Sequence, residues 1–223
     1  MLPSHTVENY LKTILLAQAA NPTSDALVPM GQIATALGVA PGTATTMIKA
    51  LAEAGLARYE PYMGVRLTPA GEKLAGLVIR RHRLIELFLV RVLGMSWAEV
   101  HDEAEQLEHA VSERLIDRID DMLGRPAADP HGDPIPSAEG MVASLYHVDL
   151  LTAPMNVSLV VTRVIDQDPA FLRFAEERQL MPEQQVVVEG RDAASDSVRL
   201  RNRAGEVLTI GARAASKVLV SPV

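Results

Sequence analysis

The hydrophobic residues at the start of the chain repeat with the period of a helix. Val7, Leu11 and Ile14 fall on one face, which predicts a first helix before the breaker-rich stretch 20–29. Two helices separated by a short turn come next, and Pro at the start of the second and Gly just past its end are the expected boundaries. Two short segments then predict a hairpin. This order is typical of a winged helix-turn-helix, whose second paired helix enters the DNA major groove.

The rest of the chain changes from helical to β periodicity. From Pro69 to about Leu123 apolar residues recur at helical spacing, and the segment 124–140, rich in Pro, Gly and Asp, is expected to be a linker or extended loop. After about residue 155, five short alternating segments predict a small β-barrel with one helix (168–180) among its strands. The fold class is therefore mainly α with a small β domain. The expected domains are 1–74, 75–140 and 141–223.

Two of the predicted helices each carry a histidine and a glutamate one turn apart. On the second of these helices, at about 100° per residue, two histidines and two glutamates fall within an arc of about 100°. Apolar residues border both pairs, and antiparallel packing of neighbouring helices would bring the pairs together. The candidate ligands are His82, Glu86, His101, Glu105, Glu108 and His109.

Two explanations of these residues remain open. Acidic helices commonly face water, and glutamate and histidine at helical spacing need no further partner. Clustered carboxylates repel one another unless a cation holds them, however, and the chain has no cysteine. Imidazole and carboxylate without thiolate favour Mn²⁺ or Fe²⁺ over softer ions, although Zn²⁺ also binds such ligands.

Charge and composition limit the partners of the chain. The formal net charge is −7 over 223 residues, but residues 1–75 carry five basic and five acidic side chains, so the acidic surplus lies elsewhere. A local patch of the N-terminal domain can therefore still bind DNA. No signal peptide is expected, and the apolar run near residue 90 is interrupted by charges and too short to cross a bilayer. A cytoplasmic protein without a membrane partner is expected.

Three stretches of sequence form a recognisable pattern. They are Val-His-Asp-Glu-Ala-Glu-x-x-Glu-His (100–109), Arg-His-Arg-Leu (81–84) and Asp-Pro-His-Gly-x-Pro-Ile-Pro (129–136). With the winged helix, they resemble the diphtheria-toxin-repressor family of metal-dependent transcriptional regulators over nearly the whole chain. The resemblance implies a helical dimerisation domain, an SH3-like C-terminal domain, and a homodimer that binds a palindromic DNA operator and represses metal-homeostasis genes.

The resemblance also implies two sets of metal ligands. One set is Asn9, Glu105, Glu108 and His109, and the other is His82, Glu86 and His101, completed by Asp168 with Asp166 or Gln167. His131, in the Pro/Gly-rich segment, is not expected to bind metal.

Three positions bear on the branch of the family. The iron-sensing branch has Cys where Glu105 stands and Met where Asn9 stands, whereas the manganese branch has carboxylate at the position of Glu105. The manganese branch also has acids at the positions of Asn9 and Lys12, so a two-manganese cluster on the first helix is not expected. The chain is therefore closer to the manganese branch, with Mn²⁺ as the expected cofactor and Fe²⁺ as the alternative.

The predicted recognition helix offers small polar groups and one cation to DNA. Hydroxyls can donate to phosphates or base edges, and Pro and Thr carbons can contact thymine methyl groups. No arginine is present there for bidentate reading of guanine, so modest direct readout helped by DNA shape is expected. The candidate contacts are Pro41, Thr43, Thr45, Thr46 and Lys49 on this helix, with Arg58, Arg66 and Lys73 around the wing.

The expected mechanism is a metal-activated repressor, in which metal orders the first helix and the dimer for operator binding. Two alternatives remain: a winged-helix regulator that ignores metal, and a metallohydrolase built on the same His/Glu cluster. The hydrolase alternative lacks a His-Glu-x-x-His motif, a phosphate-binding Gly loop and a nucleophile elbow. No enzymatic activity is therefore expected.

Overall fold

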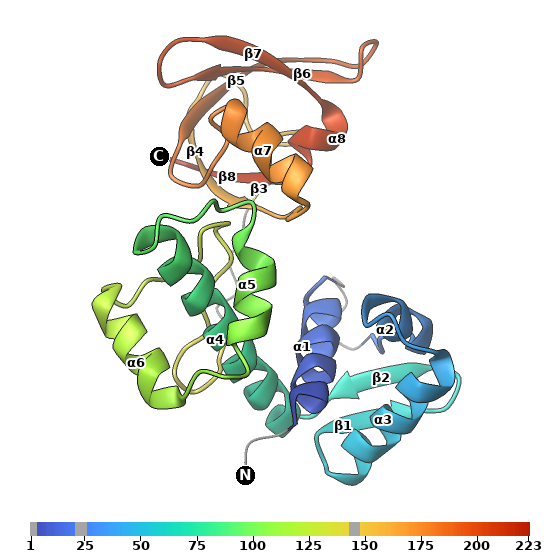
Figure 1. Ribbon diagram of the computed structural model, residues 1–223. Coiled ribbons are helices and arrows are strands. Elements are labelled where there is room, and N and C mark those ends of the chain that lie inside the picture. Colours follow the sequence, from blue (N-terminus) through green and yellow to red (C-terminus); the bar gives the residue numbers. More distant parts are fainter. Residues whose placement is uncertain (1–3, 21–25, 143–147) are drawn as a thin grey trace. The chain divides into compact units, whose positions relative to one another are not determined.

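The computed structural model describes residues 4–20, 26–142 and 148–223 (Figure 1). These residues form two compact units: residues up to His82 together with 136–142, and residues 83–135 together with 148–223. Helix α4 (Pro69–Arg91) runs through the division. The three domain ranges expected from the sequence stay a prediction, and the two units are described one at a time.

The first unit is the predicted winged helix-turn-helix. The hydroxyl of Ser4 caps the first helix by accepting from the amide of Val7. Gly38, with φ of 63°, ends the second helix, and Pro41 occupies the first turn of the third. The elements before α4 are α1 (His5–Ala19), α2 (Met30–Ala36), α3 (Pro41–Glu53), β1 (Ala57–Glu60) and β2 (Gly64–Leu67).

A single apolar core holds the first unit together. Leu11 and Ile14 of α1, Ile48 of α3 and Val65 of β2 are completely buried in it. Val28 forms an isolated antiparallel bridge to Val65, which adds a third short segment to the wing hairpin. The helix faces predicted from the hydrophobic period are thus the faces that pack, and they fix α3 against the hairpin.

The helical part of the second unit consists of the end of α4 with α5 (Val100–Leu107) and α6 (Glu113–Met122). Leu84, Val100 and Ile116, one from each helix, are buried in a common core. Two helices thus occupy the region 100–122. Over the described part of the chain, none of the helices has the length and hydropathy that a bilayer crossing requires.

The β domain contains all five strands and the helix that the sequence predicts. Its six-stranded antiparallel sheet has the order β3-β8-β4-β5-β6-β7. Helix α7 packs against the sheet through Leu172 and Ala175 (Figure 1). The elements are β3 (Val148–Asp149), β4 (Ser158–Val164), α7 (Pro169–Glu177), β5 (Gln185–Asp192), β6 (Ser197–Asn202), β7 (Val207–Gly211), α8 (Ala212–Ala215) and β8 (Val218–Pro222).

The segment before residue 136 is an ordered, packed loop. Residues 131–135 are all buried within the second unit. Gly132 adopts φ of 86°, and a Cβ atom there would lie 2.0 Å from the carbonyl oxygen of Thr162 on β4. The loop therefore approaches β4 too closely for any side chain at this position.

Candidate metal centre

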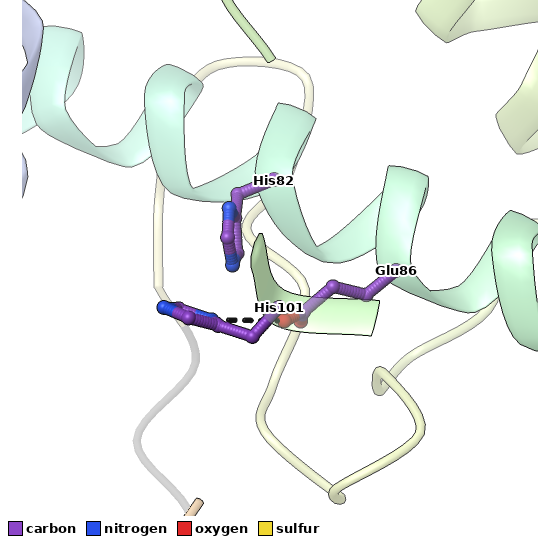
Figure 2. A group of neighbouring side chains, drawn as sticks. All are labelled: His82, Glu86 and His101. Atoms are coloured by element: carbon purple, nitrogen blue, oxygen red, sulfur yellow. Dashed lines mark hydrogen bonds and ion pairs between the residues drawn. The ribbon is translucent and has the colours of Figure 1, made fainter. Parts of the chain in front are cut away.

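Three candidate ligands from α4 and α5 meet at one point (Figure 2). His82 and Glu86 lie one turn apart on the continuous helix α4, and His101 lies in the first turn of α5. Their ligand atoms lie within 4.8 Å of one another. Nδ1 of His101 is 3.3 Å from Oε1 of Glu86, whose side chain is buried. We call these three residues the outer group; the structure brings them together as the sequence predicted.

The C-terminal half of the predicted ligand stripe does not lie on one helix. Helix α5 ends at Leu107, Glu108 is its C-cap, and His109 lies in the following turn. The single-helix prediction is wrong here because Ser112 caps a new helix, α6, by accepting from the amide of Leu115. Glu108 is nevertheless completely buried.

The remaining glutamates of this stretch still lie close to a histidine. Oε1 of Glu108 is 3.4 Å from Nε2 of His109. Oε1 of Glu105 is 3.9 Å from Nε2 of His101, one turn earlier on α5. The break after α5 has thus rearranged the predicted ligands but has not separated them.

The predicted helix-1 ligand has an acceptor atom with no partner. Asn9 on α1 is partly buried, and its Oδ1 accepts no hydrogen bond within the described part of the chain. One turn further on, Nζ of the buried Lys12 lies 3.2 Å from Nδ1 of His82, in the same unit. Asn9 belongs to the first unit and Glu105, Glu108 and His109 to the second, so their joint role as ligands stays a proposal.

A further group, buried inside the second unit, was not expected from the sequence. Glu86, Asp129 and His131 are 1%, 5% and 1% exposed, and their ligand atoms lie within 4.8 Å of one another. We call them the interior group. Its members come from α4 and from the packed loop, so Glu86 belongs to both groups: its Oε1 faces His101, and its Oε2 is 4.0 Å from Nδ1 of His131.

The imidazole of His131 is held so that one nitrogen faces the carboxylates. Nε2 lies 2.8 Å from the carbonyl oxygen of Trp97, and the ring stacks on the indole of Trp97 with centroids 5.5 Å apart. A carbonyl only accepts, so Nε2 carries a proton, and Nδ1 is the ring nitrogen that faces the carboxylates. Nδ1 has no hydrogen-bond partner among the described residues and is 3.9 Å from Oδ1 of Asp129. It is therefore placed as a ligand atom.

The carboxylate of Asp129 is fixed by the loop and lies close to two other carboxylates. Its Oδ1 accepts from the backbone amides of His131 and Asp133, at 2.8 and 2.9 Å. Burial, followed by the charges of Asp133 and Glu86, raises the pKa of Asp129 well above its usual range, against the lowering effect of Arg83. Crowded buried carboxylates of this kind require a proton or a cation.

The donor atoms of the interior group suit a divalent transition-metal ion. Nitrogen and oxygen ligands lie about 2.0–2.2 Å from such ions. Nδ1 of His131 lies 3.9 and 4.0 Å from the two carboxylates, so these three side chains are close enough together that they could hold one such ion. The crowded buried carboxylates, and the Nδ1 of His131 without a hydrogen-bond partner among the described residues, both fit a cation at this position.

The residues expected to complete the site from the β domain have other contacts. Oδ1 of Asp168 caps α7 by accepting from the amides of Ala170 and Phe171. Asp166 forms an ion pair with Lys217. Among the described residues, no group of three close ligand atoms includes Asp168. Its role as a ligand therefore stays a prediction.

Comparisons with known proteins agree with this geometry. Residues 3–65 match the model described as iron dependent repressor, N-terminal DNA binding domain, and residues 68–137 match the model for the iron dependent repressor metal binding and dimerisation domain. The chain belongs to the iron-dependent repressor family. The diphtheria toxin repressor of Corynebacterium efficiens is among its relatives, at 33% identity over 132 residues, so the family predicted from the sequence motifs is confirmed.

Relatives in this repressor family include proteins named for both metals. The regulator MntR of Lysinibacillus sphaericus is 35% identical over 122 residues, which cover 55% of this chain and 84% of MntR. The iron-dependent repressor IdeR of Mycobacterium leprae is 30% identical over 203 residues, 85% of this chain and 86% of IdeR. A solved manganese-dependent transcriptional repressor in complex with manganese has a TM-score of 0.85 and 38% identity, over 97% of this chain and 100% of that one. These relatives are regulators, which removes the metallohydrolase alternative.

The DNA-binding domain of this family member presents the predicted residues on α3 and the wing. Thr43 and Lys49 are exposed. The hydroxyls of Thr45 and Thr46 donate to helix carbonyls four residues earlier, at 2.9 and 3.0 Å, which leaves their methyl groups and lone pairs for DNA. Arg58 on β1 stands directly opposite Arg66 on β2, so the two predicted arginines of the wing lie side by side on the hairpin.

Proposed function

We propose that this chain is a metal-activated, DNA-binding transcriptional repressor that acts in the cytoplasm as a homodimer on a palindromic operator and controls metal-homeostasis genes. The observation that supports this most directly is the interior group. It places two buried carboxylates and an unpaired imidazole nitrogen within the region that matches the family's metal binding and dimerisation domain.

We propose two cation sites on each chain. Glu86 would take part through both of its oxygens, one toward the outer group and one toward the interior group. Asn9 would contribute the orphaned Oδ1 of α1. A bound cation would add positive charge beside these crowded carboxylates. The proposed ligands are Asn9, Glu105, Glu108 and His109 for one site, and Glu86, Asp129 and His131 with the neighbouring His82 and His101 for the other; Asp168 stays a candidate.

Mn²⁺ is the proposed effector and Fe²⁺ the alternative. Every proposed ligand atom is nitrogen or oxygen, and the chain has no cysteine. Ligands of this kind suit the harder divalent ions. A relative in the same family is named manganese-dependent and another iron-dependent, which supports both ions; manganese comes first because the manganese-dependent relative is 38% identical and the iron-dependent one 30%.

Contacts inside the first unit can connect the ligand-bearing helix to the DNA-reading helices. The buried Arg81 of α4 pairs with Glu8 of α1, with Nη1 3.4 Å from Oε1. Lys12 of α1 approaches His82 of α4, as described above. Because α1 packs in the same core as α3, a change in α4 reaches the recognition helix through α1. Metal shifts the protein from a DNA-free to a DNA-binding conformation only by as much as it binds the second conformation more tightly than the first.

The proposal is tested by measuring operator affinity with and without Mn²⁺, after selecting an operator from random DNA with the metal-loaded protein. Metal is expected to raise affinity by about 5- to 150-fold, the usual range of such couplings. Equal affinity in the two conditions would instead support a metal-independent winged-helix regulator. A crystal soaked in Mn²⁺, with anomalous scattering measured, identifies the ligands.

Replacing Lys49 with alanine is expected to weaken operator binding and to flatten its salt dependence. Lys49 is an exposed cation on α3, and each phosphate contact contributes about 0.9 to the slope of log K against log salt. The slope is measured by fluorescence anisotropy between low and moderate salt. The control is Arg203→Ala, which removes an exposed cation of the β domain and should leave the slope unchanged. An unaltered slope for Lys49→Ala would remove this residue from the DNA contacts.

A further inference from the structure

A buried arginine lies beside the interior group in the second unit. Arg83 on α4 is 8% exposed, and its Nε is 3.6 Å from Oδ2 of Asp129. Its Nη2 is 3.5 Å from Oδ1 of Asp133, and its Nη1 donates to the carbonyl of Pro134 at 2.6 Å. The guanidinium therefore faces one ligand of the interior group and one carboxylate that is not part of it.

The carboxylate of Asp133 is held by partners of its own. Arg163 of β4 forms an ion pair with it, and Nε2 of Gln167 donates to its Oδ2 at 2.7 Å. The backbone amide of Asp133 donates to Asp129, which fixes the spacing of the two acids. Asp133 therefore stays in place as an acceptor for Arg83 whether or not Asp129 is also available.

Two arginines stand among the acidic side chains beside the interior group. Arg83 faces Asp129 and Asp133, and Arg163 pairs with Asp133. An arginine keeps its proton even when buried, so its charge is permanent. A cation at the interior group would approach the charge of Arg83, and like charges repel more strongly in a protein interior than in water.

We propose that Arg83 is an internal counter-ion that sets the cation affinity of the interior group. This inference rests on the proposed cation site there. Without a cation, Arg83 neutralises Asp129 and Asp133 together; with one, Asp133 retains Arg83 and leaves Asp129 to the ion. Arg83 acts through Asp129 as a positioning residue and weakens the site, which keeps the bound ion in exchange with the free ion, as a sensor requires.

The test measures Mn²⁺ affinity by competition with a fluorescent chelator, in a Glu108→Gln, His109→Ala background that removes two ligands of the other proposed site and leaves the interior group intact. In this background Asp129→Asn should abolish tight binding, which establishes the site. Arg83→Met is expected to tighten binding by about tenfold or more, because the opposing charge is gone. Arg83→Lys keeps the charge and should stay within about threefold of the parent. Arg163→Met, whose charge faces Asp133, should tighten binding less than Arg83→Met.

The Mn²⁺ affinities of these variants distinguish an effect of the charge of Arg83 from an effect of its packing on the loop. If Arg83 only holds the loop in place, Arg83→Met will bind Mn²⁺ more weakly, and this result overturns the inference. Equal affinity of the methionine and lysine variants also overturns it. If the parent background binds no Mn²⁺ and no difference from Asp129→Asn is seen, the cation site itself is wrong, which is a distinct failure.

A second measurement does not depend on the folding of Arg83→Met. Asp133→Asn removes the acceptor that retains Arg83, so Arg83 stays on Asp129 and Mn²⁺ binding should weaken by about tenfold. In the Arg83→Met background the same substitution should have a clearly smaller effect, since no guanidinium competes. Unchanged or tighter binding in the Asp133→Asn single variant contradicts the proposal, as do additive effects in the double variant.

Discussion

Replacing Glu86 with glutamine is expected to remove cation binding at both the outer and the interior group, and to lower the metal-dependent gain in operator affinity. Glu86 is the one ligand that the two groups share, with one oxygen 3.3 Å from His101 and the other 4.0 Å from His131. An amide of the same shape carries no charge to offset the cation. Metal analysis of the Mn²⁺-saturated, gel-filtered variant and its operator affinity with and without Mn²⁺ check this result. Unchanged metal content or activation contradicts it.

The same substitution should stabilise the metal-free fold. The pKa of Asp129 is raised by burial and then by Asp133 and Glu86. A raised pKa of a carboxyl in the folded state adds stability below its unfolded pKa, and this stability is lost as the pH rises through the folded pKa. Without the charge of Glu86 less stability is lost, so metal-free Glu86→Gln should melt at or above the temperature of the wild type at neutral pH. The control is Glu103→Gln, which replaces an exposed acid of α5 and should change neither the melting temperature nor the metal-dependent gain in operator affinity.

Replacing Gly132 with alanine is expected to destabilise the second unit by roughly 2–5 kcal/mol. The left-handed backbone conformation, with φ of 86°, costs about 1–2 kcal/mol for alanine. The new Cβ atom would lie 2.0 Å from the carbonyl oxygen of Thr162, so the loop must also move away from β4. The loop carries Asp129 and His131, so Mn²⁺ affinity should fall together with stability. Chemical denaturation and metal titration of the variant measure both effects.

Gly205 provides a matched control for this prediction. Its φ is 87°, almost the same as that of Gly132, but a Cβ atom at Gly205 would meet nothing within 4 Å. Gly205→Ala should therefore cost only the backbone part, about 1–2 kcal/mol, and leave metal affinity unchanged. Equal destabilisation by the two substitutions would show that the contact with Thr162 has no energetic effect.

The sequence predicted the outer group because its geometry is local. A helix fixes residues one turn apart on the same face, so His82 and Glu86 could be paired from spacing alone, and the packing of α5 then brought His101 to them. The same method failed at His109, where the helix stops. The N-cap of α6 at Ser112 was readable in principle, since serine before an amphipathic stretch is a common start signal.

The interior group escaped prediction because Glu86 precedes Asp129 and His131 by 43 and 45 positions. The Asp-Pro-His-Gly stretch carries turn residues, and turn residues predict exposed loops. The signal that was present is an Asp and a His two residues apart beside a glycine, in a motif already noted as part of the family resemblance. Burial of this loop depends on β4, which follows it only after residue 157.

The sequence by itself determined the winged helix, the helical region, the five strands of the β domain and the family, because hydrophobic period and boundary residues act within a few residues of one another. Only the tertiary structure decided that Glu86 serves two groups, that His131 is oriented by Trp97, and that Arg83 stands beside Asp129. These features arise from contacts between distant segments, where burial removes water and leaves charges to be balanced by whatever side chain or ion the fold places beside them.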